Sequence, residues 1–170
     1  MKKPIINNIF PTPVYITKID REFTKQELQF VNEQKKYCKN NTGNLHTKDS
    51  YILNKKEFKN IKKFLDECCK DYLNKVICPK VSGVLYLNSD IKNDKILFSH
   101  PISYKQIRPE IDKTKFNLWN SDTWYFPVET GNLFMFPSST THQVETKQGN
   151  NTRISLAFNT FYKGTVGSNS

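Results

Sequence analysis

The stretch Val81-Ser82-Gly83-Val84-Leu85-Tyr86-Leu87 begins just after Pro79 and is rich in β-branched and aromatic residues. This composition is typical of a β-strand, and the proline marks the end of a helical spacing of apolar residues upstream. Similar short runs, separated by turn residues, occupy positions 95–98, 123–128, 132–136 and 152–158. The C-terminal half of the chain is therefore predicted to consist of short strands.

Two helices are predicted before these strands. Thr24-Lys25-Gln26-Glu27 fits a capping box, in which the threonine and glutamate side chains satisfy free amides at a helix start, so we expect a helix over residues 25–38. Apolar residues at helical spacing predict a second helix over 55–76. A polar loop is expected between them at 39–50, and a proline-flanked edge strand at 9–16.

Helices followed by several short strands indicate an α+β fold. We expect a jelly-roll core, also called a double-stranded β-helix, with the N-terminal helices packed on its outside. The length of 170 residues suits one domain, with a helical part over about 20–78 and a jelly-roll part over about 81–163.

The amino-acid composition indicates in which compartment the protein is found and which partners it can bind. No apolar run approaches the roughly 20 residues that a membrane helix requires. The four cysteines lack the C-x-x-C spacing of a zinc site, so we interpret them as reduced thiols of a cytoplasmic protein. The net charge of +10 allows nucleic-acid binding, but its lysines are dispersed, which favours a solvated basic surface.

The most informative polar residues are His142 and Arg153, which lie eleven positions apart. In a strand, Arg153 and Ser155 point to one face while the apolar residues between and after them point to the other. An arginine among small residues inside a barrel needs an anionic partner, and its planar fork suits a carboxylate. A neutral histidine nearby is a common metal ligand. Alternatively, Arg153 forms a structural ion pair with an acidic neighbour.

Three motifs distinguish the second half of the chain: Val81-Ser82-Gly83-Val84-Leu85-Tyr86-Leu87-Asn88, Phe136-Pro137-Ser138 before Thr141-His142, and Arg153-Ile154-Ser155-Leu156-Ala157-Phe158-Asn159. Through these motifs, the chain from Val81 to Gly164 resembles the 2-oxoglutarate and Fe(II)-dependent oxygenases related to prolyl 4-hydroxylases, which include members from bacteria and their phages. Phe10-Pro11-Thr12-Pro13-Val14 and Asn41-Thr42-Gly43-Asn44 are also similar to that family.

This resemblance implies a dioxygenase, of hydroxylase type, that uses Fe(II), 2-oxoglutarate and O2. It implies His142 as an iron ligand and Arg153 as the partner of the distal 2-oxoglutarate carboxylate. Ser155 and Tyr86 are expected to assist Arg153. A cytoplasmic location is expected, in the host cell if the protein is encoded by a phage.

One part of the family pattern is missing. The family supplies two further ligands from a His-x-Asp, His-x-Glu or His-x-His motif just before the strand at Val81, where this chain has Val76-Ile77-Cys78-Pro79-Lys80. Three explanations stay open: the segment was omitted from the given sequence between Val76 and Val81, it was deleted, or it was lost in a protein that no longer binds iron. His46 and His100 are weaker candidates for substitute ligands. Two rivals remain: a metal-free jelly-roll binding or scaffold protein, and a basic nucleic-acid-binding protein.

Overall fold

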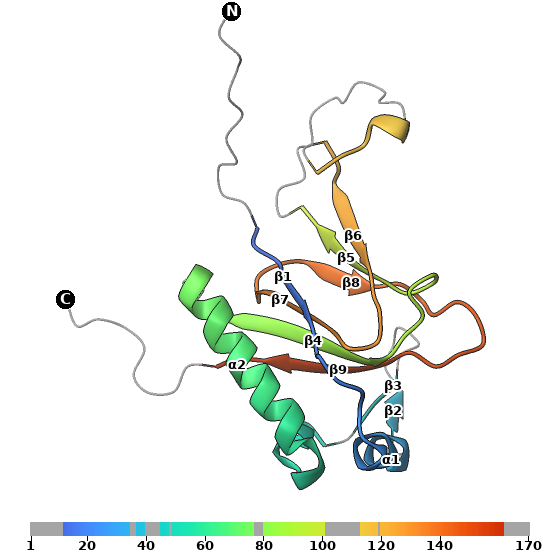
Figure 1. The fold of residues 1–170 in the computed structure, drawn as a ribbon. Coiled ribbons are helices and arrows are strands. Elements are labelled where there is room, and N and C mark those ends of the chain that lie inside the picture. The colour runs from blue at the N-terminus through green and yellow to red at the C-terminus, as the bar shows by residue number, and fades with distance from the viewer. Residues whose placement is uncertain are drawn as a thin grey trace, which may run out of the picture.

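The computed structural model describes residues 12–34, 37–39, 45–47, 49–76, 80–100, 113–118 and 120–161 (Figure 1). These residues form two α-helices and antiparallel strands, which confirms a mixed fold with helices before the main strands. The helices are α1 (Lys25–Glu33) and α2 (Lys59–Val76), and short 3-10 turns occupy η1 (Ile52–Asn54), η2 (Lys56–Phe58) and η3 (Lys113–Lys115). The strands are β1 (Tyr15–Lys18), β2 (Tyr37–Lys39), β3 (Leu45–Thr47), β4 (Val81–Asn88), β5 (Lys95–Ser99), β6 (Thr123–Pro127), β7 (Asn132–Pro137), β8 (His142–Val144) and β9 (Ile154–Asn159).

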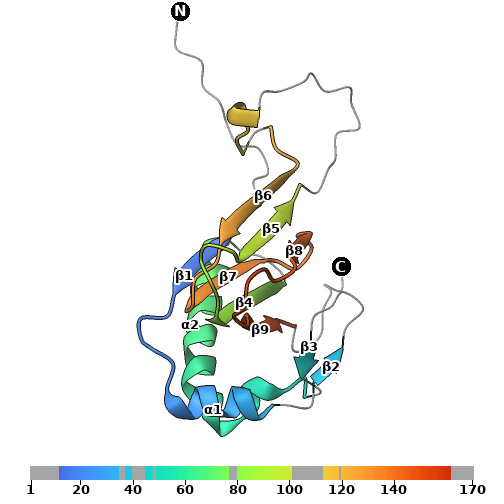
Figure 2. The same cartoon turned by 90° about the vertical axis from the view of Figure 1, so that its right-hand side faces the viewer.

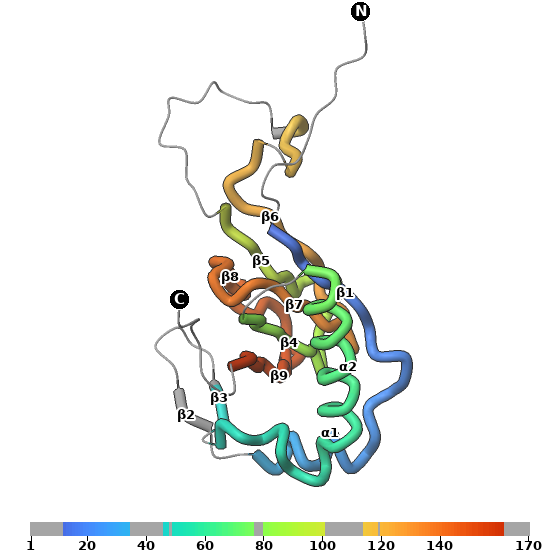
Figure 3. The backbone as a smooth tube through the Cα atoms, turned by 90° about the vertical axis from the view of Figure 1, so that its left-hand side faces the viewer, coloured from blue at the N-terminus to red at the C-terminus, as the bar shows by residue number. Residues whose placement is uncertain are grey.

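The strands pair into two main antiparallel sheets. One has four strands in the order β1-β7-β4-β9, and the other has three in the order β6-β5-β8. Helix α2 lies along the outer side of the four-stranded sheet, with β5 and β6 on the opposite side (Figures 2 and 3). Two antiparallel sheets with helices outside are compatible with the predicted jelly-roll.

Alternation along the central strands divides the core into two layers. On β4, Leu85 and Leu87 face the helices, where they join Leu65 of α2 in one buried cluster. Their neighbours Val84 and Tyr86 face the three-stranded sheet and pack with its strand β5 in a second cluster. Strand β4 is buried on both faces because each face is covered by a different layer. The alternating pattern of the sequence therefore positions Tyr86 between the two sheets.

Gly83 permits a close approach between β4 and β9. It is paired with Phe158, whose ring covers the glycine on the helix side of the sheet. A Cβ atom at position 83 would lie 2.2 Å from Phe158 Cζ, far inside van der Waals contact. Glycine is therefore required here by packing.

Gly83→Ala is expected to lower the free energy of unfolding by about 1–3 kcal/mol, the usual cost of overpacking a core. Urea denaturation followed by circular dichroism measures this change. Adding Phe158→Leu to the same chain should recover part of the loss, because the smaller side chain leaves room for the new methyl group. An alanine variant as stable as the wild type would show that the ring moves aside without cost.

The predicted capping box is present at the start of α1. The Glu27 amide donates to Thr24 Oγ1 at 3.2 Å, and the Thr24 amide donates to Glu27 Oε2 at 2.7 Å. Glu27 also accepts two hydrogen bonds from the Arg21 guanidinium, at 2.7 and 2.9 Å. Burial alone would raise the pKa of Glu27, but the bonds from Arg21 and Thr24 outweigh it and hold that pKa below its usual value. The helix start is therefore fixed by a charged carboxylate.

Acid is expected to remove this contribution of Glu27. Since its folded pKa is lowered, the carboxylate stabilises the protein fully above the unfolded pKa of about 4.3, and this stabilisation is lost as the pH falls through the folded pKa. Glu27→Gln should be less stable than the wild type at pH 7, and the difference should narrow below about pH 4. Urea denaturation of the wild type and Glu27→Gln, repeated from pH 7 to below about pH 4, measures this difference in stability. A constant difference would contradict the expectation.

The structure corrects several predicted boundaries. The first helix ends at Glu33 instead of residue 38, and within 39–50 the strand β3 pairs with β2, so part of the expected loop is a hairpin. The second helix begins at Lys59, after two 3-10 turns. Strand β8 was not predicted. Of the four cysteines, Cys68 and Cys69 carry free thiols, while Cys78 lies outside the described residues.

Candidate functional site

The inner face of β9 is an open strip of small side chains. Ser155 is paired with Tyr86 and Ala157 with Val84, and paired residues of an antiparallel sheet point to the same face. Tyr86 and Val84 belong to the core between the two sheets, so Ser155 and Ala157 face that space too. Both are nevertheless exposed, because β9 is the edge of its sheet. The inter-sheet space is therefore open along β9.

Arg153 lies at one end of this strip, immediately before β9, with a side chain that is 9% exposed. Its Nη1 donates to Asp94 Oδ1 at 3.2 Å, and its Nη2 donates to the Glu145 carbonyl oxygen at 2.9 Å. The expectation that Arg153 has an anionic partner is met by an acidic residue of the chain itself. The sequence left open whether this arginine forms an ion pair or binds a ligand, and the structure contains the ion pair.

Asp94 is fully buried and is held firmly in place. Its Oδ2 accepts a hydrogen bond from the Asp90 amide at 2.8 Å, and its own carbonyl accepts one from Val128. The ammonium of Lys147 lies 3.4 Å from Oδ1, the same oxygen that Arg153 contacts. Asp94 therefore bridges two cations that come from the segment between β8 and β9.

Tyr86 lies beside this ion pair. Its ring packs edge-on against Phe134 with centroids 6.1 Å apart, and the residue is fully buried. Among the described residues, no hydrogen-bond partner is present for Tyr86 Oη. Burial raises the pKa of Tyr86 to about 12, with Arg153 lowering and Asp94 raising it. The phenol is therefore a neutral buried group with an unmet hydrogen-bonding capacity.

His142 opens strand β8 and faces the same inter-sheet space. It is paired with Phe98 of the inner core, and its ring lies 4.5 Å from that of Phe136. The Nδ1 atom is 2.9 Å from the Thr140 carbonyl oxygen. A proton on Nδ1 would make this a hydrogen bond and leave Nε2 as an acceptor, the arrangement usual for a metal-binding histidine.

His142 and Arg153 occupy opposite ends of the strip. Phe136, which His142 contacts, is paired with Ser82, whereas Arg153 lies near Tyr86. Ser82 and Tyr86 are four positions apart on β4, which corresponds to about 13 Å along a strand. The two side chains thus face one space with several ångströms between them.

The other candidate ligands do not join this site. His46 lies on the β2–β3 hairpin and is exposed, and His100 is exposed just after β5. Among the described residues, no group of three or more His, Cys, Asp or Glu side chains could hold a metal ion. The described part of the chain therefore contains no complete set of metal ligands around His142. Nor is any helix of this part long and apolar enough to cross a membrane.

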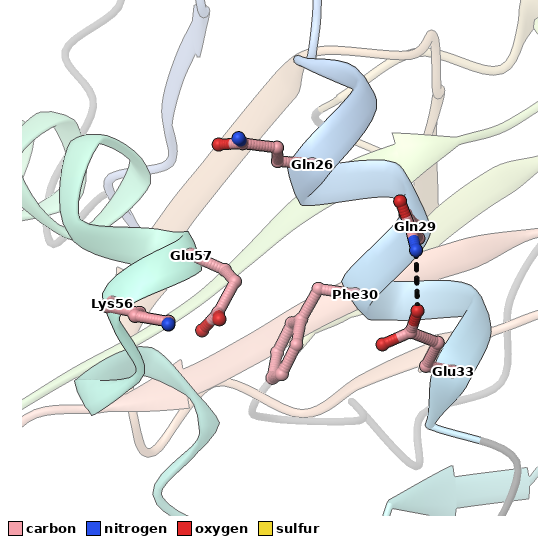
Figure 4. A pocket seen from close by; sticks show the side chains of 6 residues that line it. All are labelled: Gln26, Gln29, Phe30, Glu33, Lys56 and Glu57. Atoms are coloured by element: carbon pink, nitrogen blue, oxygen red, sulfur yellow. Dashed lines mark hydrogen bonds between the residues drawn. The ribbon is translucent and has the colours of Figure 1, made fainter.

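Two surface cavities lie away from this space. One, of about 770 Å³, adjoins the β1–α1 connection and includes Arg21 and Gly131. The other, of about 460 Å³, lies between α1 and η2 (Figure 4). Polar side chains and one phenylalanine line the latter cavity: Gln26, Gln29, Phe30, Glu33, Lys56 and Glu57. Neither cavity contains a residue of the predicted site.

Asp94 and Lys147 were missed by sequence reasoning. The need of Arg153 for an anion was a signal that an acidic partner exists, but it did not identify which of the 16 acidic residues would serve. Asp94 is 59 positions away from Arg153 in the chain. Only the folding of the β4–β5 turn onto the β8–β9 connection brings them together.

Comparison with known proteins agrees with the resemblance seen in the sequence. Residues 78–159 match the family described as "Putative 2OG-Fe(II) oxygenase". This range includes Tyr86, His142, Arg153 and Ser155. No curated protein and no solved structure matched the chain. Residues 78–159, just under half of the chain, are therefore similar to the 2OG-Fe(II) oxygenase family.

Proposed function

We propose that this protein is a 2-oxoglutarate- and Fe(II)-dependent dioxygenase, of hydroxylase type, that binds the distal carboxylate of its cosubstrate at Arg153. The observation that carries the proposal is Tyr86 Oη, a buried hydroxyl beside Arg153 without a partner among the described residues. A buried polar group without a hydrogen bond costs roughly 1–3 kcal/mol. A ligand carboxylate would accept the phenol hydrogen and remove this cost.

The neighbouring residues support a dicarboxylate in the same space. Ser155 is the cross-strand partner of Tyr86 and presents a hydroxyl on the open face of β9. Arg153 supplies positive charge and five N–H donors, of which Asp94 and Glu145 engage two. Tyr86, Ser155 and Arg153 would hold one end of the ligand, while its other end extends toward His142.

His142 would supply one iron ligand through Nε2, with Nδ1 oriented by the Thr140 carbonyl. When bound, iron and 2-oxoglutarate supply the oxidising chemistry that transfers oxygen from O2 to a C–H bond. The chain contributes binding and orientation: Arg153 and Tyr86 fix the cosubstrate, and the apolar inter-sheet core excludes water from one side of it. Among the described residues, no group of three His, Cys, Asp or Glu side chains completes this iron site.

A second candidate is a metal-free binding protein built on the same fold. Two observations favour it. The described residues contain no metal-binding group of three side chains, and Arg153 is already paired with a carboxylate of the chain. Such a protein would bind carboxylate ligands without iron and release no succinate.

Succinate release in the presence of Fe(II), ascorbate and 2-oxoglutarate tests the proposal. Because one histidine does not hold Fe(II) firmly, we expect slow turnover from the 170-residue chain, abolished by His142→Ala. His46→Ala, on the exposed hairpin, is the matched control and should retain the wild-type rate. Rapid turnover that survives His142→Ala would show that the ligands lie elsewhere. Carboxylate binding without any turnover would favour the metal-free binding protein.

A further inference from the structure

The Asp94 carboxylate occupies the position next to Arg153 where the proposed function places a ligand carboxylate. It is fully buried and contacts the guanidinium at 3.2 Å. The charge of Arg153 is thereby partly compensated inside the protein, because Asp94 is shared between Arg153 and Lys147. A second carboxylate that approaches Arg153 meets an ion pair instead of a free cation, and its attraction is correspondingly weaker.

We propose that Asp94 is an internal competitor for Arg153, which weakens the binding of 2-oxoglutarate and is displaced from Arg153 when the cosubstrate binds. The inference rests on the proposed function, because it takes Arg153 to be the anchor of the distal carboxylate. It adds a specificity-determining residue, Asp94, because a carboxylate ligand binds Arg153 only if it can displace Asp94.

Lys147 makes the exchange feasible. Its ammonium is 3.4 Å from the same Asp94 oxygen that Arg153 contacts, and its side chain is 19% exposed. If Arg153 turns to a ligand, Asp94 keeps a cation beside it and is not left as an unpaired buried charge, which would be strongly unfavourable. The Asp90 amide continues to donate to the other oxygen of Asp94. Both arrangements therefore pair every charge.

The competition has a simple consequence for affinity. Asp94→Asn keeps the shape of the side chain and an oxygen for the Asp90 amide, but removes the charge that neutralises Arg153. The variant should bind 2-oxoglutarate at least tenfold more tightly than the wild type. It should also gain more thermal stability from 2-oxoglutarate, because the ligand replaces the missing negative charge.

Calorimetric titration of 2-oxoglutarate into the 170-residue wild type, Asp94→Asn and Asp66→Asn provides the test. Asp66 pairs with Lys62 on the exposed face of α2, so Asp66→Asn changes the net charge equally but far from Arg153. We expect tighter binding only in Asp94→Asn. Equal or weaker binding in Asp94→Asn, with measurable binding by the wild type, overturns the competition and leaves the proposed function intact. If none of the three proteins binds 2-oxoglutarate, the proposed function and the inference both fail.

A crystal structure of the wild type with 2-oxoglutarate keeps the inference testable if Asp94→Asn does not fold. The Arg153 Nη1 to Asp94 Oδ1 distance should increase from 3.2 Å to beyond hydrogen-bonding range, with Arg153 turned to the ligand. A ligand bound at Arg153 with the Asp94 contact unchanged overturns the proposed competition.

Discussion

Arg153→Met is expected to lower the free energy of unfolding by about 1.5–3 kcal/mol, the usual contribution of a hydrogen bond to a charged group, because Lys147 still pairs with the buried Asp94. Asp94 is fully buried, and the variant would leave it with Lys147 at 3.4 Å as its cationic neighbour. Methionine retains part of the apolar stem, so the loss reports mainly on charge and hydrogen bonding. Urea denaturation followed by circular dichroism measures it.

Two further variants isolate the cause. Lys62→Met removes a lysine from an exposed ion pair with Asp66 and should change stability little. Combining Arg153→Met with Asp94→Leu should recover most of the loss, since the buried carboxylate disappears together with its partner. If Arg153→Met alone is as stable as Lys62→Met, Arg153 does not stabilise the fold through Asp94.

Leu85→Ala is expected to cost about 2–5 kcal/mol, because Leu85 is 0% exposed between the four-stranded sheet and α2. The deleted atoms would leave a cavity that the surrounding helix and strands only partly fill. Leu73→Ala is the matched control, as the same change at a residue that is 37% exposed should be nearly neutral. Denaturation curves for both variants decide this, and equal losses would contradict the two-layer core.

Local patterns in the sequence predicted the parts of the fold that depend on local physics. The capping box at Thr24 was confirmed bond by bond, because its atoms lie within four residues of one another. The two-residue period of β9 correctly separated Leu156, in the helix-side core, from the exposed Ser155. Both features need only chain geometry and the burial of apolar side chains.

Features that depend on distant parts of the chain could not be predicted. Strand β8 is three residues long and exists because it pairs with β5. The sequence predicted that Arg153 has an anionic partner. Only the connections between the sheets identify this partner as Asp94. The buried hydroxyl of Tyr86, which has no partner among the described residues, likewise depends on side chains that are distant in the sequence. The roles of His142, Arg153, Ser155 and Tyr86 in binding stay predictions.

Calorimetric titration of 2-oxoglutarate into the wild type, Arg153→Lys and Tyr86→Phe tests the central claim most directly. Arg153→Lys keeps a positive charge near Asp94 but loses the planar fork, and Tyr86→Phe removes only the phenol hydroxyl. The account predicts one bound 2-oxoglutarate per wild-type chain and at least tenfold weaker binding in each variant. Equal affinity in all three proteins, or no binding by the wild type, would contradict it.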